Sequence, residues 1–123
     1  MIVLLEVGAG GMLGAPARYV LDQFVSSKTE GAFPWGTFVV NLTGALLLGF
    51  IIGLSVHNRL GPEPVALIGT GFCGAYTTFS TFTYETVTMI LEGRNLSALY
   101  NVGGSLALGL LGAGAGLALA ALV

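Results

Sequence analysis

Four long apolar stretches, separated by short connections, constrain the fold of this chain more than any other feature. They cover residues 1–24, 35–56, 64–91 and 96–123. Each stretch reaches the roughly 20 residues that an α-helix needs to cross about 30 Å of hydrocarbon. Most of the charged side chains lie in or beside the connections. The pattern predicts an all-α membrane protein with four transmembrane helices per subunit, in one domain that covers residues 1–123.

The charge of the chain supports this interpretation. Charged residues make up 8% of the sequence, whereas about 25% is usual in a soluble domain. Four basic and six acidic side chains cannot coat a domain of this size, so most of the surface must face the lipid bilayer. No basic patch is present, and we therefore expect no nucleic-acid partner.

Glycine is unusually frequent, with 20 residues. A glycine in a helix of a soluble protein costs about 1 kcal/mol relative to alanine, whereas in lipid small residues let helix backbones approach closely. Pairs four residues apart, such as Gly49 and Gly53 or Gly112 and Gly116, are typical of helix–helix contacts. This frequency favours an oligomer over a single four-helix subunit.

The basic residues leave the orientation in the membrane open. With four spans, both termini and the second connection lie on one side, which holds only Arg59. The opposite side holds Arg18, Lys28 and Arg94. Because basic residues near helix ends set the orientation, three residues against one is a weak bias. The sequence therefore permits dual topology, in which copies insert in both orientations.

No arrangement of residues typical of an enzyme is present. His57 is the only histidine, and it lies in a polar connection without a serine or cysteine nucleophile arranged near it. Cys73 is the only cysteine and lies inside an apolar run, where it serves as small hydrophobic filler. We therefore expect no catalytic residues.

Polar residues inside the third stretch are the most informative part of the sequence. Residues 74–85 read GAYTTFSTFTYE, in which hydroxyl side chains crowd around two phenylalanines. β-Branched hydroxyl residues after glycines favour a break in the helix, which we expect near Gly74 to Thr78. Broken backbone at this depth is tolerated where it is buried or lines a cavity, and its free carbonyls suit a cation. Packed rings with back-bonded hydroxyls are the alternative interpretation.

Two polar pairs lie on the neighbouring spans. Thr37 and Asn41 are four residues apart and share a helix face, and Asn101 and Ser105 repeat this spacing in the last stretch. Hydrogen bonds between helices would explain each pair. A water-filled path would explain them as well, because polar groups in lipid face either partners or such a path.

The chemistry of these side chains suits a small anion. They offer an asparagine amide, several hydroxyls and the rings of Phe79 and Phe82, which lie on one helix face. The edge of a phenyl ring carries the positive part of its quadrupole and therefore attracts an anion. No lysine or arginine lies in mid-membrane to trap the ion. Glu6 and Glu85 argue mildly against an anion path.

Three motifs resemble those of the bacterial fluoride channel family, Fluc (also called CrcB). They are GAPARY at residues 14–19, GTFVVNLTG at 36–44 and GFCGAYTTFSTF at 71–82, and the similarity covers nearly the whole chain. The resemblance implies a passive channel formed by an antiparallel, dual-topology homodimer, with two fluoride pathways built from both subunits. It also implies a multi-pass protein of the bacterial cell (inner) membrane that lets fluoride leave the cytoplasm down its gradient.

The resemblance also implies roles for individual residues. Phe79 and Phe82 would turn their ring edges toward the ion, and Asn41 would hydrogen-bond it. The other pathway residues implied by the family are Thr37, Ser80, Thr81, Asn101 and Ser105.

Two further sites follow from the same resemblance. Arg18 would lie near the aqueous vestibule. Backbone carbonyls of Gly74 and Thr77, two from each subunit, would bind a structural sodium ion at the dimer centre.

Two other functions share part of this pattern. A small multidrug-resistance-type, proton-coupled transporter would also have four helices in an antiparallel dimer, but it needs a central carboxylate in its first helix, and Glu6 lies close to the chain end. A non-conducting membrane scaffold would pass no ion after reconstitution.

Overall fold

The computed structural model of the chain describes residues 1–123 and contains helices joined by short connections, with no β-strand. This confirms the predicted all-α class. The elements are α1 (Ile2–Lys28), α2 (Trp35–Val56), α3 (Pro62–Pro64), the π-helix η1 (Val65–Cys73), α4 (Gly74–Tyr76), α5 (Ser80–Leu91) and α6 (Asn95–Leu122). The predicted stretch of residues 35–56 coincides with α2 at both ends.

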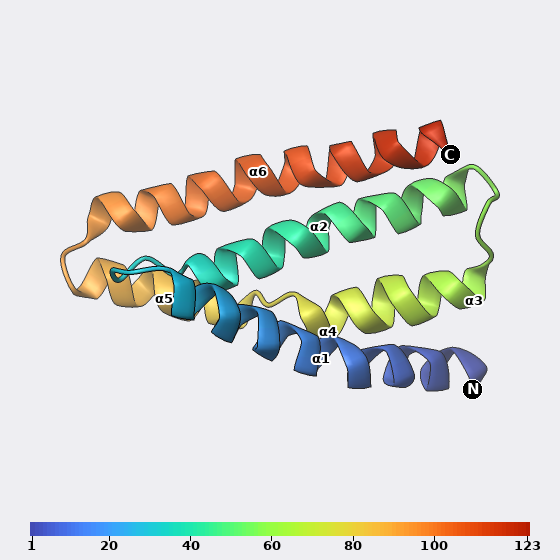
Figure 1. The fold of residues 1–123 in the computed structure, drawn as a ribbon, viewed down its shortest axis with the longest axis horizontal. Helices are drawn as coiled ribbons and strands as arrows, with labels where there is room; N and C mark the ends of the chain where they lie inside the picture. Colours follow the sequence, from blue (N-terminus) through green and yellow to red (C-terminus); the bar gives the residue numbers. More distant parts are fainter.

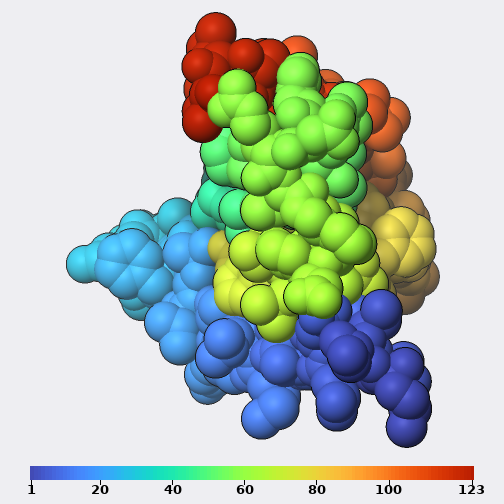
Figure 2. Space-filling model, turned by 90° about the vertical axis from the view of Figure 1, so that its right-hand side faces the viewer, coloured from blue at the N-terminus to red at the C-terminus, as the bar shows by residue number.

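The elements form four rods that run side by side (Figure 1). Helices α1, α2 and α6 are one rod each, whereas α3, η1, α4 and α5 follow one another along what we call the third rod. Helix α2 packs against α6, and α1 packs against η1. Both chain termini lie at the end of the bundle that carries the connection from α2 to α3 (Figure 1). Viewed from that end, α1 and α6 lie on opposite sides of the molecule (Figure 2).

Glycines let neighbouring rods touch through their backbones. A Cβ atom added at Gly49 on α2 would lie 2.9 Å from the Ala113 Cα on α6. One added at Gly71 on η1 would lie 2.6 Å from the Val7 carbonyl oxygen on α1. Both distances are shorter than a carbon atom tolerates against backbone, so these crossings require glycine.

Two of the rods are long and apolar enough to cross a membrane: α2, with 22 residues, and α6, with 28. In the most apolar 18-residue segment of each helix, only 28% of α2 and 11% of α6 is buried. Neither helix therefore resembles the core helix of a soluble protein, which is mostly buried. Helix α1 carries charged side chains, and the third rod is divided among shorter elements. Crossing of the membrane by all four rods therefore stays a prediction.

The third rod is interrupted at residues 77–79, which we call the break. Helix α4 ends at Tyr76, and Thr77 adopts an extended conformation with φ −82° and ψ 159°. Helix α5 then begins at Ser80. The predicted interruption is therefore present but lies slightly later than the predicted residues 74–78, because Gly74 to Tyr76 are still helical.

The backbone before the break is also irregular. The nine residues of η1 form a π-helix, a wider helix that often occurs at functional sites. Gly74 follows it in helical conformation, with φ −62° and ψ −39°. The Cys73 carbonyl oxygen accepts from the Thr77 backbone N–H at 2.9 Å and from the Thr77 hydroxyl at 2.8 Å, and such back-bonding often bends a helix.

Candidate functional site

An open groove beside the break brings together four of the eight predicted pathway residues. Its volume is about 490 Å³, and its walls come from α2, the break, the start of α5 and α6. The residues that line the groove are Asn41, Gly44, Ala45, Leu48, Thr77, Thr78, Phe79, Phe82, Val102, Ser105 and Leu106. Predicted residues from three separate apolar stretches thus meet at one place.

The side-chain amide of Asn41 holds the break against α2. Its Nδ2 donates to the Thr78 carbonyl oxygen at 2.9 Å, and its Oδ1 accepts from the Thr78 backbone N–H at 2.9 Å. The amide therefore replaces helical partners that Thr78 loses where the third rod is interrupted. An asparagine amide carries two N–H donors, so Asn41 keeps one that makes no hydrogen bond within the chain.

Two diverted N–H donors at the break free two carbonyl groups. In an uninterrupted helix, the Thr78 N–H would donate to the Gly74 carbonyl and the Thr81 N–H to the Thr77 carbonyl. Here the Thr78 N–H donates to Asn41, and the Thr81 N–H donates to the Thr78 hydroxyl at 3.2 Å. The Gly74 and Thr77 carbonyls therefore lack their regular helical donors, and these are the two groups predicted to bind sodium.

The two phenylalanines lie close together but differ in exposure. The ring centroids of Phe79 and Phe82 are 6.1 Å apart, with a tilt of 42° between the rings. Phe79 is 80% exposed, whereas Phe82 is half-buried against the subunit. An apolar ring this exposed, on the rim of a groove lined mostly by apolar side chains, is available to a second subunit.

A second cavity, which we call the vestibule cavity, lies where α1 and α2 meet the break. It has a volume of about 200 Å³ and is lined by Arg18, Tyr19, Asp22, Thr37, Val40, Thr78 and Thr81. It gathers the predicted vestibule residue and two predicted pathway hydroxyls. Because Thr78 also lines the groove, the break lies between the two spaces.

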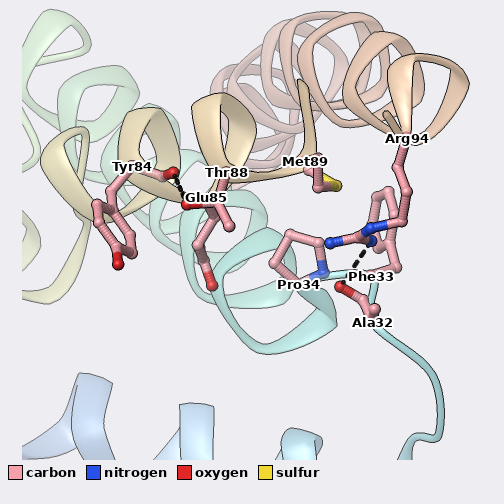
Figure 3. Close-up of a pocket in the computed structure, with 8 residues that line it drawn as sticks. All are labelled: Ala32, Phe33, Pro34, Tyr84, Glu85, Thr88, Met89 and Arg94. Atoms are coloured by element: carbon pink, nitrogen blue, oxygen red, sulfur yellow. Dashed lines mark hydrogen bonds between the residues drawn. The ribbon is translucent and has the colours of Figure 1, made fainter. Parts of the chain in front are cut away.

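A third cavity, of about 270 Å³, lies at the end of the bundle that carries the connections from α1 to α2 and from α5 to α6. Its lining includes Glu85, and in Figure 3 the Glu85 side chain points toward the start of α2. The Arg94 guanidinium on the opposite wall donates to the Ala32 carbonyl oxygen at 3.3 Å (Figure 3). It is also 2.7 Å from the Glu92 carboxylate. No predicted pathway residue lines this cavity.

The predicted pair on the last stretch is divided between two environments. Asn101 is 1% exposed, and its Nδ2 donates to the Thr86 hydroxyl at 2.9 Å. Thr86 in turn donates to the Phe82 carbonyl oxygen at 2.8 Å, so Asn101 fixes the backbone behind that ring. Ser105 lines the groove, and its buried hydroxyl oxygen has no hydrogen-bond partner.

Ser80 is the first residue of α5, between Phe79 and Thr81. It is exposed, and its hydroxyl is 3.5 Å from that of Thr78. It lines neither the groove nor the vestibule cavity.

Sequence reasoning missed one functional residue and one contact. Thr78 pairs with Asn41 through its backbone and caps α5 through its hydroxyl, although the sequence marked it only as part of a hydroxyl cluster. The missed contact joins the hydroxyls of Tyr76 and Thr43, which are 2.8 Å apart. Nothing in the spacing of residues along the sequence predicted it.

Neutral donors therefore line a groove that holds no lysine or arginine, which suits passage of a small anion. Two freed carbonyls beside it suit a hard cation, since such ions prefer oxygen ligands. No group of three or more His, Cys, Asp or Glu side chains could hold a metal ion.

Comparisons with known proteins give a consistent result. The family model described as "CrcB-like protein, Camphor Resistance (CrcB)" matches residues 5–117. The chain is 46% identical over 112 residues to "Fluoride-specific ion channel FluC 1" of Streptomyces avermitilis, which covers 91% of this chain and 90% of the relative. It is 50% identical over 107 residues to "Fluoride-specific ion channel FluC 2" of Moorella thermoacetica, which covers 87% of each. The range matched by the family model contains the break and the positions of both predicted phenylalanines.

Proposed function

The chain belongs to the CrcB-like family, and we propose that it is a passive, fluoride-selective channel through which fluoride leaves the cytoplasm. Relatives that align over most of its length carry the name of fluoride-specific ion channels. The family is one of ion channels, so the chain is not an enzyme. Neither comparison favours a small multidrug-resistance-type transporter.

The observation that carries the proposal is the lining of the groove. The side chains of Asn41, Phe79, Phe82 and Ser105 border one space, and Asn41 keeps one N–H donor that makes no hydrogen bond within the chain. The Ser105 hydroxyl oxygen is buried and has no hydrogen-bond partner. A hydrogen bond from a neutral donor to a charged group contributes about 1.5–3 kcal/mol, which offsets part of the dehydration of the ion. Because no fixed positive charge lines the groove, the ion is also able to leave.

The proposed path needs a second subunit. The groove is open on one side, and Phe79 on its rim is 80% exposed. Only 21 of 123 residues are buried, so much apolar surface remains available for a partner and for lipid. In the proposed antiparallel homodimer, the partner closes the groove, and the weak bias of basic residues permits the two orientations that this requires.

The freed carbonyls support a structural sodium ion at the centre of that dimer. Gly74 and Thr77 would each contribute a carbonyl oxygen, so that two subunits supply two plus two ligands around the twofold axis. Four carbonyl dipoles that converge on one point repel one another, and a cation removes that repulsion. The diverted N–H donors of Thr78 and Thr81 support this assignment, because they leave the two oxygens without competing partners.

The direction of flow follows from the chemistry of fluoride. Hydrogen fluoride crosses a membrane as a neutral acid and ionises in the less acidic cytoplasm, where the anion is trapped. A passive channel in a bacterial inner membrane would return the anion down its gradient without ATP. All four rods would cross that membrane in this arrangement.

The test is an efflux measurement on purified protein in liposomes. Liposomes loaded with potassium fluoride are diluted into fluoride-free medium, potassium is released with valinomycin, and a fluoride electrode records the anion outside. We expect rapid fluoride release and no chloride release from matched liposomes. Proton-coupled uptake of an organic cation without fluoride release would favour the transporter, and no flux of any ion would favour the scaffold.

A further inference from the structure

Tyr76, the last residue of α4, makes a contact with α2 that the proposed path does not use. Its hydroxyl lies 2.8 Å from Oγ1 of Thr43. Thr43 donates to the Val39 carbonyl oxygen at 2.8 Å, so Tyr76 is the donor to Thr43. The two hydrogen bonds form a chain from the third rod into the backbone of α2, and bonds in such chains strengthen one another.

Packing holds the Tyr76 ring in place independently of its hydroxyl. The residue is 8% exposed, and its ring stacks on Phe72 with centroids 5.4 Å apart and 17° between the planes. A Cβ atom added at Gly44 would lie 3.3 Å from the ring, so the ring lies against α2 where no side chain intervenes. A buried tyrosine hydroxyl usually finds a hydrogen-bond partner, and Thr43 is the partner here.

Two attachments to α2 therefore enclose Thr77. Tyr76 is bound to Thr43 on one side, and Thr78 is bound to Asn41 on the other. The partners on α2 are two residues apart, as are those on the third rod. Rotation of the peptide groups around Thr77 requires at least one attachment to open.

We propose that Tyr76 and Thr43 form a positioning pair that fixes the orientation of the Gly74 and Thr77 carbonyls for the sodium ion. The inference rests on the sodium site of the proposed function. Removal of the Tyr76 hydroxyl leaves the Tyr76 ring packed and α4 folded, but it lets the backbone at the end of α4 rotate more freely. The ion must then restrict that motion itself, and it binds more weakly.

The test compares variants that remove the hydrogen bond and keep the shape of the side chains. Tyr76→Phe and Thr43→Val each delete one partner, and the double variant deletes both. Tyr100→Phe is the matched control, because Tyr100 is 62% exposed and its hydroxyl makes no hydrogen bond within the chain. The first readout is the sodium concentration that gives half of the maximal thermal stabilisation of the purified protein. The second is hydrogen exchange of the backbone amides of residues 77–79.

We expect each single variant to raise the half-maximal sodium concentration about fivefold, the equivalent of about 1 kcal/mol for one neutral hydrogen bond. Exchange at residues 77–79 should accelerate by a similar factor without sodium, and the double variant should match either single variant. Fluoride efflux at saturating sodium should stay near that of the wild type.

Several results would overturn the positioning pair. These are an unchanged sodium midpoint with unchanged exchange, additive effects in the double variant, or an equal effect of Tyr100→Phe. If sodium does not change the thermal stability of the wild-type protein, both the sodium site and the positioning role of the pair are refuted. The proposed fluoride path does not depend on that result. Absence of fluoride efflux from the wild type would instead contradict the proposed function, and neither readout of the pair depends on efflux.

Discussion

Asn41 and Thr78 are joined by two hydrogen bonds of 2.9 Å, although they lie 37 positions apart in the chain. The amide of Asn41 satisfies the N–H and the C=O of Thr78, as a neighbouring backbone would. This pairing links the break to α2, withdraws the Thr78 N–H from the Gly74 carbonyl, and leaves one N–H of Asn41 without a partner in the chain. One side chain therefore serves the anion groove and the proposed cation site together.

Asn41→Asp should reduce fluoride efflux at least tenfold. An ionised aspartate still accepts from the Thr78 N–H, but it has no donor for the Thr78 carbonyl and places a negative charge beside the groove. The measurement is the initial rate of fluoride release from liposomes. Asn58→Asp adds the same charge in the exposed connection between α2 and α3 and should leave the rate unchanged. Wild-type efflux through Asn41→Asp would remove Asn41 from the path.

Phe82→Ile should slow fluoride efflux by one or more orders of magnitude while the dimer stays assembled. Isoleucine is apolar and of comparable bulk, but it has no ring edge to face an anion. Efflux is measured together with the dimer fraction by size-exclusion chromatography. Phe24→Ile, on the exposed face of α1, is the matched control. Equal rates for both variants would show that the ring edge has no role.

Replacement of sodium by a large organic cation should destabilise the dimer and lower efflux. The Gly74 and Thr77 carbonyls would then face their copies in the partner without a charge between them. Thermal unfolding of purified protein with and without sodium measures the effect, and potassium in place of sodium tests selectivity for the smaller ion. An unfolding midpoint that is independent of sodium would argue against the site.

Asn101→Ala should mainly lower stability, whereas Ser105→Ala should mainly change fluoride efflux. Asn101 is buried and bound to Thr86, so its loss should lower the free energy of unfolding by about 1–3 kcal/mol. Ser105 lines the groove without a partner, so its loss should change efflux more than stability. Unfolding in denaturant and efflux from liposomes are measured on both variants. A larger loss of efflux in a stable Asn101→Ala variant would place Asn101 in the path.

Features that depend on composition and local propensity were predicted from the sequence. The bounds of α2 matched because Trp35 and Val56 mark the ends of a mostly apolar run that contains no charged residue and no proline. The break was predicted because hydroxyl side chains offer local hydrogen bonds in place of helical ones, as the Thr78 hydroxyl does for the Thr81 N–H. Both signals lie within a few residues of the feature that they specify.

Features that depend on register between distant helices were not predicted. The spacing of Asn101 and Ser105 placed them on one helix face, but it could not show that α5 covers one and leaves the other in the groove. The sequence also gave no reason to pair Asn41 with backbone rather than with a side chain. Such contacts are set by how closely α2 approaches the third rod, and that distance depends on glycines such as Gly44.

A substitution that fills the groove with a large side chain tests most directly whether fluoride passes through it. Ala45 lines the groove on α2, and Ala45→Trp would fill much of the groove. Asn41 and the two phenylalanines are not substituted in this variant. We predict that wild-type liposomes release fluoride and retain chloride, and that the tryptophan variant, assembled as a dimer, releases neither. Fluoride release by the assembled variant at the wild-type rate would contradict passage through this groove.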